Sequence, residues 1–144
     1  MVTVNWAGGM AFEADPPSGN KFTMDSHEDF GGANLGPSPV EALLSALAAC
    51  SAIDVLSILQ KKHQQVTAYR IEVDGERPPN GVFPRPFTSL VVRHIVTGVN
   101  IDPTAVERAV QLSDDKYCSV IATLRANPKV TSEFRIEESE AASV

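Results

Sequence analysis

The sequence predicts an α+β fold in which antiparallel sheets surround one long central helix. Three observations indicate this class: alternating apolar residues near the N-terminus, a long apolar stretch in the first half, and two further alternating stretches that precede shorter helical patterns. The chain of 144 residues suits a single domain, residues 1–144. With 43% apolar and 21% charged residues, the composition is that of a soluble globular protein.

Three short strands are expected at the N-terminus, because apolar and polar residues alternate there with a period of two. The alternating stretches are residues 2–8, 10–15 and 21–25. A Gly-Gly pair separates the first two, and the turn cluster PPSGN separates the second from the third. These strands predict a meander, and the Gly-, Pro- and Ser-rich residues 26–39 predict a loop after it.

A long helix is expected over residues 39–63. Ser38 suits the N-cap, Pro39 suits the first helical position, and Glu41 completes a capping box. At roughly 24 residues, the helix is far above the mean of about 11–12 in globular proteins. Since it is apolar on nearly all sides, other elements or a second chain must cover it. Glu41 and Asp54 argue against a membrane span, because an acid near the bilayer centre costs about 2.5–3.5 kcal/mol.

The second half of the chain predicts strands, then helices, then a final strand. Alternation identifies the strands, and a Pro-rich connection joins the first two. Asp102 and Pro103 suit the start of a helix, and Asn127-Pro128 suits the end of another. The expected elements are strands at 66–76 and 87–98, helices at 102–113 and 114–127, and a last strand at 129–138, before a frayed tail at 139–144.

The charge and the cysteine content exclude several classes of partner. A net charge of -6 argues against nucleic acid or an anionic membrane as the main partner. The N-terminal residues lack the basic and apolar regions of a secretory signal, so a cytoplasmic, reducing setting is expected. Two cysteines with scattered histidines do not provide the four ligands usual for zinc, so no metal site is expected. The histidines are His27, His63 and His94.

The two cysteines are the candidate reactive residues, although each has a simpler interpretation. Cys50 lies within the long helix on a face shared with Leu47 and Asp54, and free cysteines on such faces are typically inert core residues. Cys118 lies near the start of the predicted third helix, where the helix dipole and Lys116 favour a thiolate. If the two helices pack side by side, with α-carbons about 4.4–6.8 Å apart, the thiols can form a reversible disulfide.

Asp54 does not suit the activation of a thiol. A charged carboxylate beside a thiol disfavours the thiolate, so we expect Asp54 to pair with a cation or to face a partner subunit.

The stretches GGANLGPSPVEALLSALAAC and DDKYCSVIATL, together with the order of elements, resemble the OsmC-like family, which includes the organic hydroperoxide resistance proteins. The resemblance covers essentially the whole chain. It implies an intertwined homodimer with the long helices back to back and an active site at the interface. It also implies that Cys50 attacks a hydroperoxide, that Cys118 resolves the product as a disulfide, and that a dithiol such as a lipoylated protein reduces it. No metal or organic cofactor is implied.

The sequence departs from the pattern of the peroxidase members at two positions. Those members hold the reactive thiolate with an N-terminal arginine, whereas the first arginine here is Arg70. They orient that arginine with a glutamate ten residues before the first cysteine, where this chain has Val40; Glu41 lies about 100° away around the helix. The remaining candidates for a positive charge near Cys50 are Lys21, Arg77, Arg85 and Lys116.

Two functional hypotheses follow. The first is a thiol peroxidase that reduces organic hydroperoxides through a Cys50–Cys118 disulfide. The second is a non-catalytic protein that binds a small apolar ligand, with the thiols as part of the pocket wall. The retained cysteine pair favours the first, and the missing arginine favours the second.

Overall fold

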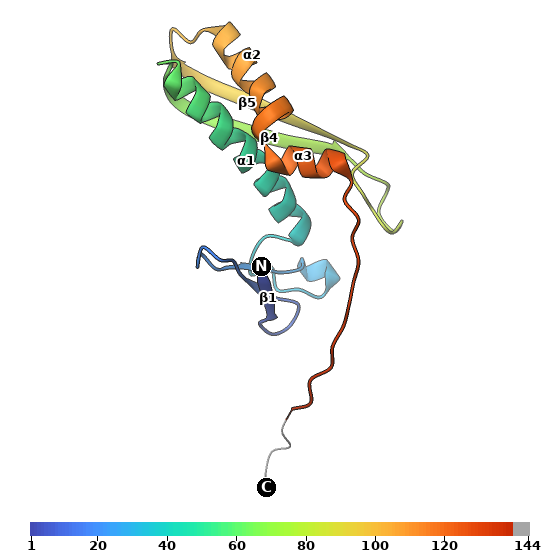
Figure 1. The fold of residues 1–144 in the computed structure, drawn as a ribbon. Coiled ribbons are helices and arrows are strands. Elements are labelled where there is room, and N and C mark those ends of the chain that lie inside the picture. Colours follow the sequence, from blue (N-terminus) through green and yellow to red (C-terminus); the bar gives the residue numbers. More distant parts are fainter. Residues whose placement is uncertain (140–144) are drawn as a thin grey trace.

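The computed structural model describes residues 1–139, which are arranged in two parts along the helix α1, Pro39–Lys61. Figure 1 shows a small N-terminal sheet beyond the N-terminal end of α1 and a second body, containing a two-stranded sheet and the other helices, along the rest of it. The predicted α+β class, with antiparallel sheets and one long helix, is confirmed. Residues 140–144 of the predicted tail lie outside the described residues.

The N-terminal sheet is the predicted meander. Its strands are β1, Thr3–Trp6, β2, Phe12–Asp15, and β3, Phe22–Met24, paired antiparallel in that order. Many of its apolar side chains remain exposed, including Val4, Trp6, Phe12 and Phe22. Three short strands with an uncovered apolar face are marginal by themselves, so this sheet requires another surface to cover it.

The loop after β3 is held by the buried carboxylate of Asp25. It accepts hydrogen bonds from the backbone N–H groups of Ser26, Ala33 and Leu35, at 2.7, 3.0 and 3.1 Å. The N–H of Leu35, followed by those of Ser26 and Ala33, lowers the pKa of Asp25. Gly32 is required for this compact path, since a Cβ there would lie 1.8 Å from the Ser26 carbonyl oxygen. The loop also contains the short 3₁₀ turn η1, Glu28–Phe30.

Helix α1 begins as the sequence predicts. The Ser38 N–H donates to Glu41 Oε2 at 2.8 Å, and the Glu41 N–H donates to Ser38 Oγ at 3.3 Å, which is the expected capping box. The role of Glu41 is therefore to cap the helix. One face of α1 is buried, at positions four apart: Leu47, Ser51, Val55 and Leu59.

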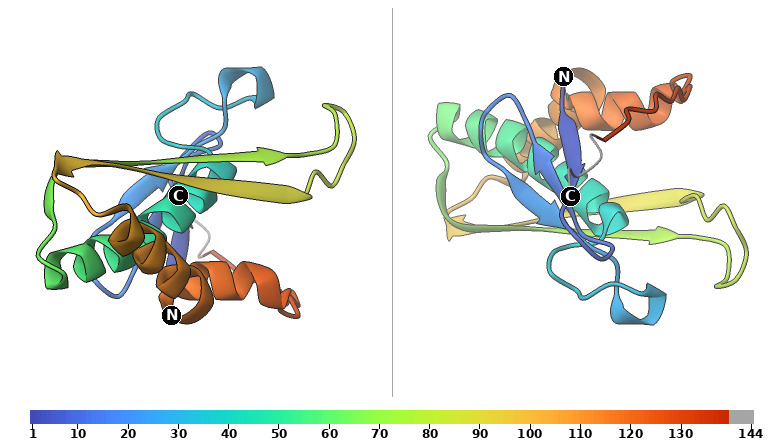
Figure 2. Two further views of the ribbon diagram at one scale, coloured as in Figure 1. Left: turned by 90° about the horizontal axis from the view of Figure 1, so that it is seen from above. Right: turned by 90° about the horizontal axis from the view of Figure 1, so that it is seen from below.

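The second body packs its helices against one face of a long hairpin. Strands β4, Gln65–Glu76, and β5, Ser89–Val99, pair antiparallel, and both views in Figure 2 place the α-helices on the same side of them. Helix α2, Pro103–Leu112, starts at the Asp102 cap, whose side chain accepts from the Thr104 N–H at 2.9 Å. The main core joins α1 to α2 through the fully buried Val55, Leu59 and Ala109. Burial of the Val55 and Leu59 side chains contributes roughly 1.5–3 kcal/mol each.

By length and composition, α1 is the one helix among residues 1–139 that could also cross a membrane, with a mean hydropathy of 2.1. One face of it packs against β4, α2 and α3, Ser119–Ala126, in the core of the fold.

The C-terminal elements differ from the prediction in two respects. The helix expected from residue 114 begins only at Ser119, because residues Ser113–Tyr117 form a π-helical turn, η2, and Cys118 is extended. The expected strand at 129–138 is wrong: no strand is assigned there, and the segment runs away from the body as an extended chain (Figure 1). The alternation of Val130 and Phe134 with polar residues is real, but a strand needs a neighbour to pair with, and a single chain provides none.

Candidate functional site

The fold brings the two cysteines together although they are distant in sequence. Cys50 lies midway along α1, and Cys118 lies at the start of α3, which packs against the middle of α1 (Figure 1). The two Sγ atoms are within 4.8 Å of each other, and both cysteines are free. Cys118 is 3% exposed, whereas Cys50 is half-buried. An incoming molecule therefore reaches Cys50 more readily than Cys118.

Cys118 is the N-cap of α3. Its Sγ accepts a hydrogen bond from the Ile121 N–H at 3.5 Å, an unusual role for a thiol but one that the extended backbone before the helix permits. Burial raises the pKa of Cys118, and the adjacent Cys50 thiol raises it further, while the N–H groups of Ile121 and Val120 oppose the shift. The pKa of Cys118 is therefore raised overall, because the effect of burial exceeds that of the N–H groups at the start of the helix.

Asp54 joins the two thiols, one turn after Cys50 on α1. One of its carboxylate oxygens lies within 4.8 Å of both sulfur atoms. No ion pair links Asp54 to a lysine, arginine or histidine in residues 1–139, so the expected pairing with a cation is wrong. Instead, Asp54 Oδ2 accepts a hydrogen bond from Ser113 Oγ at 3.1 Å. Asp54 is thus fixed by the protein interior.

This hydrogen bond is the last of a chain that crosses the protein from β4 to α1. Tyr69 OH lies 2.5 Å from His94 Nδ1, and His94 Nε2 lies 3.4 Å from Ser51 Oγ. Ser51 Oγ lies 3.2 Å from Ser113 Oγ. Ser51 and Ser113 are fully buried, and every buried side-chain polar atom among the described residues has a partner.

The donor and the acceptor in each of these hydrogen bonds follow from the number of protons that each group carries. A carboxylate only accepts, so Ser113 donates its single hydroxyl proton to Asp54. Ser51 must then donate to Ser113, and a neutral His94 must donate from Nε2 to Ser51, which leaves Nδ1 to accept from Tyr69. Desolvation lowers the pKa of His94, which agrees with the neutral ring. All four hydrogen bonds therefore point toward Asp54.

A cavity of about 380 Å³ lies next to the buried cluster that contains Cys118, although neither cysteine lines it. It lies between β5, α3 and α1, and shares Leu47 and Ile121 with the buried cluster around Cys118. Its apolar lining also includes Phe87, Leu90, Val92 and Leu124, and its polar lining consists of Thr88, Ser89, His94, Asp114 and Arg125. The cavity has the size and the mixed lining of a small-molecule site.

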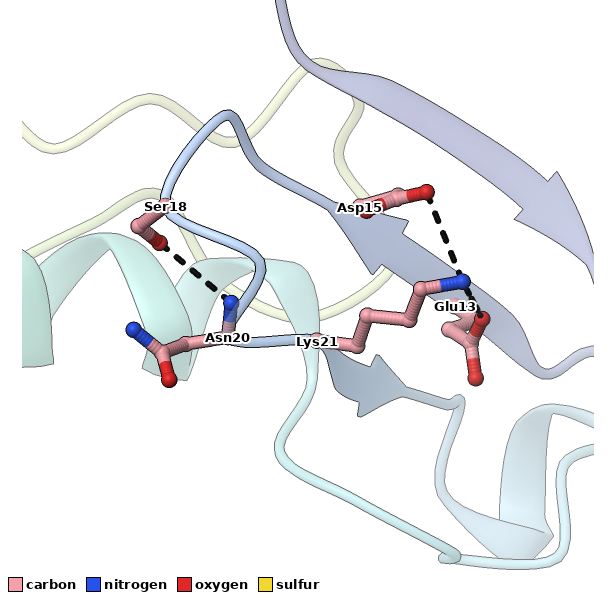
Figure 3. A network of polar contacts seen from close by, with 5 residues as sticks. All are labelled: Glu13, Asp15, Ser18, Asn20 and Lys21. Carbon is pink, nitrogen blue, oxygen red and sulfur yellow. Dashed lines mark hydrogen bonds and ion pairs between the residues drawn. The ribbon is translucent and has the colours of Figure 1, made fainter.

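The four candidate cations are engaged elsewhere. Figure 3 shows Lys21 between Glu13 and Asp15, with Nζ–O distances of 3.2 and 3.4 Å. Lys116 lies over the ring of Tyr117 at 5.5 Å. Arg77 and Arg85 donate to backbone carbonyls, those of Arg85 and Pro78, at 2.9 Å each. Among the described residues, therefore, no hydrogen bond or ion pair brings a positively charged side chain to the Cys50 thiol, as the arginine of the peroxidase members would.

We expect His94 to make the stability of the protein sensitive to pH. Since its pKa in the fold is below the ordinary 6.5, the unfolded chain binds more protons as the pH falls below that value. The free energy of unfolding should decrease from about pH 7.5 to about pH 5.5, and His94→Gln should flatten this decrease. Urea denaturation across this range measures the slope. His63→Gln, at an exposed histidine, is the control, and a variant slope equal to that of the unmodified protein contradicts the prediction.

Sequence reasoning identified the two cysteines but not the polar residues around them. Ser51, Ser113 and Tyr69 carry no motif, and their contacts span 43, 62 and 25 residues of sequence. Asp54 was detectable, because the four-residue spacing places it on the same helical face as Cys50.

Comparison with known proteins places the fold and the site in context. The sequence model of the OsmC-like protein family matches residues 31–133. Protein YhfA of Escherichia coli (strain K12) is 38% identical over 133 residues, which is 92% of this chain and 95% of that protein. A hypothetical protein from Aquifex aeolicus VF5 is 29% identical, with a TM-score of 0.73 over 88% of this chain and 86% of the other.

An organic hydroperoxide resistance protein, OsmC, from Legionella pneumophila has a TM-score of 0.62 over 88% of this chain and 90% of its own. At 13% identity, this likeness shows the shared fold alone. The family model, in contrast, spans more than half of the chain, and the Escherichia coli relative matches nearly all of it. The chain therefore belongs to the OsmC-like family.

Proposed function

We propose that the protein is a thiol peroxidase that reduces organic hydroperoxides through Cys50 and Cys118. The observation that carries the proposal is the approach of the two sulfur atoms to within 4.8 Å, near a cavity of about 380 Å³ with a mixed polar and apolar lining. To form a disulfide, the two sulfur atoms must approach from this separation to about 2.05 Å. Its lining offers apolar side chains for the organic part of a small peroxide and polar groups for the peroxide oxygens.

The reaction divides between the thiols according to their exposure. The Cys50 thiolate attacks one peroxide oxygen, the O–O bond breaks, and the products are a Cys50 sulfenic acid and an alkoxide that takes a proton to become the alcohol. The Cys118 thiol then condenses with the sulfenic acid, which forms the S–S bond and releases water. A dithiol, such as a lipoylated protein, reduces the disulfide by exchange and becomes oxidised itself. No cofactor takes part.

The absent arginine sets a limit on the rate. Among the described residues, no ion pair or hydrogen bond brings a guanidinium or ammonium group to Cys50 in place of that arginine. We therefore infer a slower nucleophile than one held by a guanidinium.

The active form is inferred to be a cytoplasmic homodimer. The uncovered apolar face of the N-terminal sheet and the apolar residues of the extended C-terminal segment, Val130, Phe134 and Ile136, support it. Contiguous exposed apolar surface of this kind is typical of a protein–protein interface. The acidic chain, with a net charge of -6, does not favour nucleic acid or an anionic membrane as partner.

The proposal is tested by adding one equivalent of cumene hydroperoxide to the reduced protein. Formation of the intramolecular disulfide removes two hydrogens, so the chain mass should fall by about 2 Da and both thiols should disappear together. Intact-mass spectrometry and a thiol titration measure the two changes. Two thiols that survive the stoichiometric dose would contradict the peroxidase function.

A second function is favoured by one specific observation, the lack of a cation at Cys50. The same cavity would then bind a small ligand without chemistry, and the thiols would be core residues packed next to its lining. A Cys50→Ser variant that retains its stability and its affinity for such a ligand, in a protein that does not react with peroxide, would support this alternative.

A further inference from the structure

Asp54 forms a cluster with the two thiols, and the proposed peroxidase reaction uses the thiols but not the Asp54 carboxylate. Cys50 and Asp54 lie four residues apart on one face of the long helix α1, and Cys118 approaches from the N-cap of α3. One donor atom from each residue lies within 4.8 Å of the other two. Two ligands at this spacing on a rigid helix are a common foundation for a metal site.

The donor set and its dimensions suit a borderline-soft divalent ion. Zinc is bound by thiolate sulfur at about 2.3 Å and by carboxylate oxygen at about 2.0–2.2 Å, so tetrahedral donors lie about 3.5–3.8 Å apart. The donors here are within 4.8 Å of one another, so a closure of about 1 Å is sufficient.

Two of the three donors are oriented by hydrogen bonds of the kind that surround metal ligands. Ser113 Oγ donates to Asp54 Oδ2, which leaves the lone pairs of Oδ1 free. The Ile121 N–H donates to Cys118 Sγ. Ligating carboxylates are typically held by such outer hydrogen bonds. Here the hydrogen bonds behind Ser113 continue through buried groups as far as Tyr69, so the orientation of Asp54 is fixed before any ion arrives.

The charge balance of the cluster also calls for a cation. Four hydrogen bonds point toward the Asp54 carboxylate, yet no lysine, arginine or histidine within residues 1–139 makes an ion pair with it. Lys61 and Lys62 line a hollow of about 460 Å³ together with Asp54, and neither lies within ion-pair distance. This hollow connects Asp54 to solvent and provides an entry path for an ion.

We propose that the reduced protein binds one Zn²⁺ ion per chain through Cys50 Sγ, Cys118 Sγ and an Asp54 carboxylate oxygen, with the fourth position open to solvent. Binding releases the two thiol protons, since thiolates are the ligands. Because a disulfide has no thiolate to offer, the zinc-bound form and the disulfide form exclude each other. The proposal needs only the reduced thiols and does not rest on the peroxidase function.

The test uses the reduced, metal-free chain and Co²⁺ as an optical probe. Tetrahedral Co²⁺ with thiolate ligands gives a sulfur-to-metal charge-transfer band, and Zn²⁺ added afterwards should displace the cobalt at one equivalent per chain. Cys50→Ser should lose the band. Asp54→Asn should weaken binding about tenfold or more, whereas Asp115→Asn, a matched charge removal on the exposed surface of η2, should not.

Either of two results overturns the site. One is the absence of the charge-transfer band in the reduced, unmodified protein, and the other is an Asp54→Asn variant that binds as tightly as the unmodified chain. Asparagine still accepts from Ser113, and thermal unfolding of the metal-free variant verifies its fold. Peroxide oxidation measured in the presence of a chelator is a separate readout, so failure of the zinc site and failure of the peroxidase are distinguished.

Discussion

Cys50→Ser is expected to reduce hydroperoxide consumption to the rate of the uncatalysed reaction, because the hydroxyl that replaces the thiol is a far weaker nucleophile. Cys118→Ser should leave the first step intact. In that variant the Cys50 sulfenic acid has no second thiol to condense with, so one equivalent of peroxide should add about 16 Da instead of removing about 2 Da. Loss of cumene hydroperoxide measures the first effect, and intact-mass spectrometry measures the second.

The pair of variants separates the roles of the two thiols. Half-buried Cys50 is accessible, whereas Cys118 is 3% exposed, so the attack is assigned to Cys50. Continued peroxide consumption by Cys50→Ser would contradict this assignment, as would a stable addition of about 16 Da on Cys118 in that variant. Ser45→Ala, an exposed serine on the same helix, controls for substitution in α1.

The parts of the fold that depend on local signals were predictable from the sequence. The start of α1 is encoded within four residues, because Ser38 and Glu41 satisfy each other's backbone N–H groups as soon as the first turn forms. Asp102 acts in the same way at α2. Strands β4 and β5 were predictable because their alternation is long, and the hairpin pairs its own two strands.

Elements that depend on distant partners were not predictable in the same way. The alternation at 129–138 specifies a face but not a neighbour, and the described chain contains no strand paired with that segment. Asp115 and Lys116 have normal helical propensity, yet the chain passes through a π turn that places Cys118 before the helix rather than inside it. The five-residue turn is where tertiary contacts override local preference.

In the candidate site, too, some features follow from local sequence signals and others depend on residues that are distant in sequence. The sequence indicates both thiols, because a lone second cysteine in a late helix is a specific pattern. It does not indicate the series of hydrogen bonds that ends at Asp54. Ser113, Ser51 and His94 are distant in sequence and meet only after α1 packs on β5 and η2. The absence of an N-terminal arginine is visible in the sequence. That each candidate cation makes its contacts with groups other than Cys50 is visible only in the structure.

Ile53→Glu is expected to dissociate the proposed homodimer. Ile53 is 69% exposed in the single chain and lies on the side of α1 opposite the buried face of Leu47 and Val55. If two long helices pack back to back, this side is buried between them. A carboxylate placed there costs several kcal/mol to desolvate, and symmetry introduces it twice.

Light scattering after size-exclusion chromatography gives the result directly. The unmodified protein should have twice the chain mass of 15.4 kDa, and Ile53→Glu should have 15.4 kDa. Gln111→Glu adds the same charge at an exposed polar position of α2, away from this side of α1, and should remain dimeric. An unmodified protein of single-chain mass would contradict the dimer, and the exposed apolar faces of the N-terminal sheet and the C-terminal segment would then need a different partner. Because both faces belong to segments that lack a neighbour in one chain, the same second copy that covers Ile53 is expected to cover them.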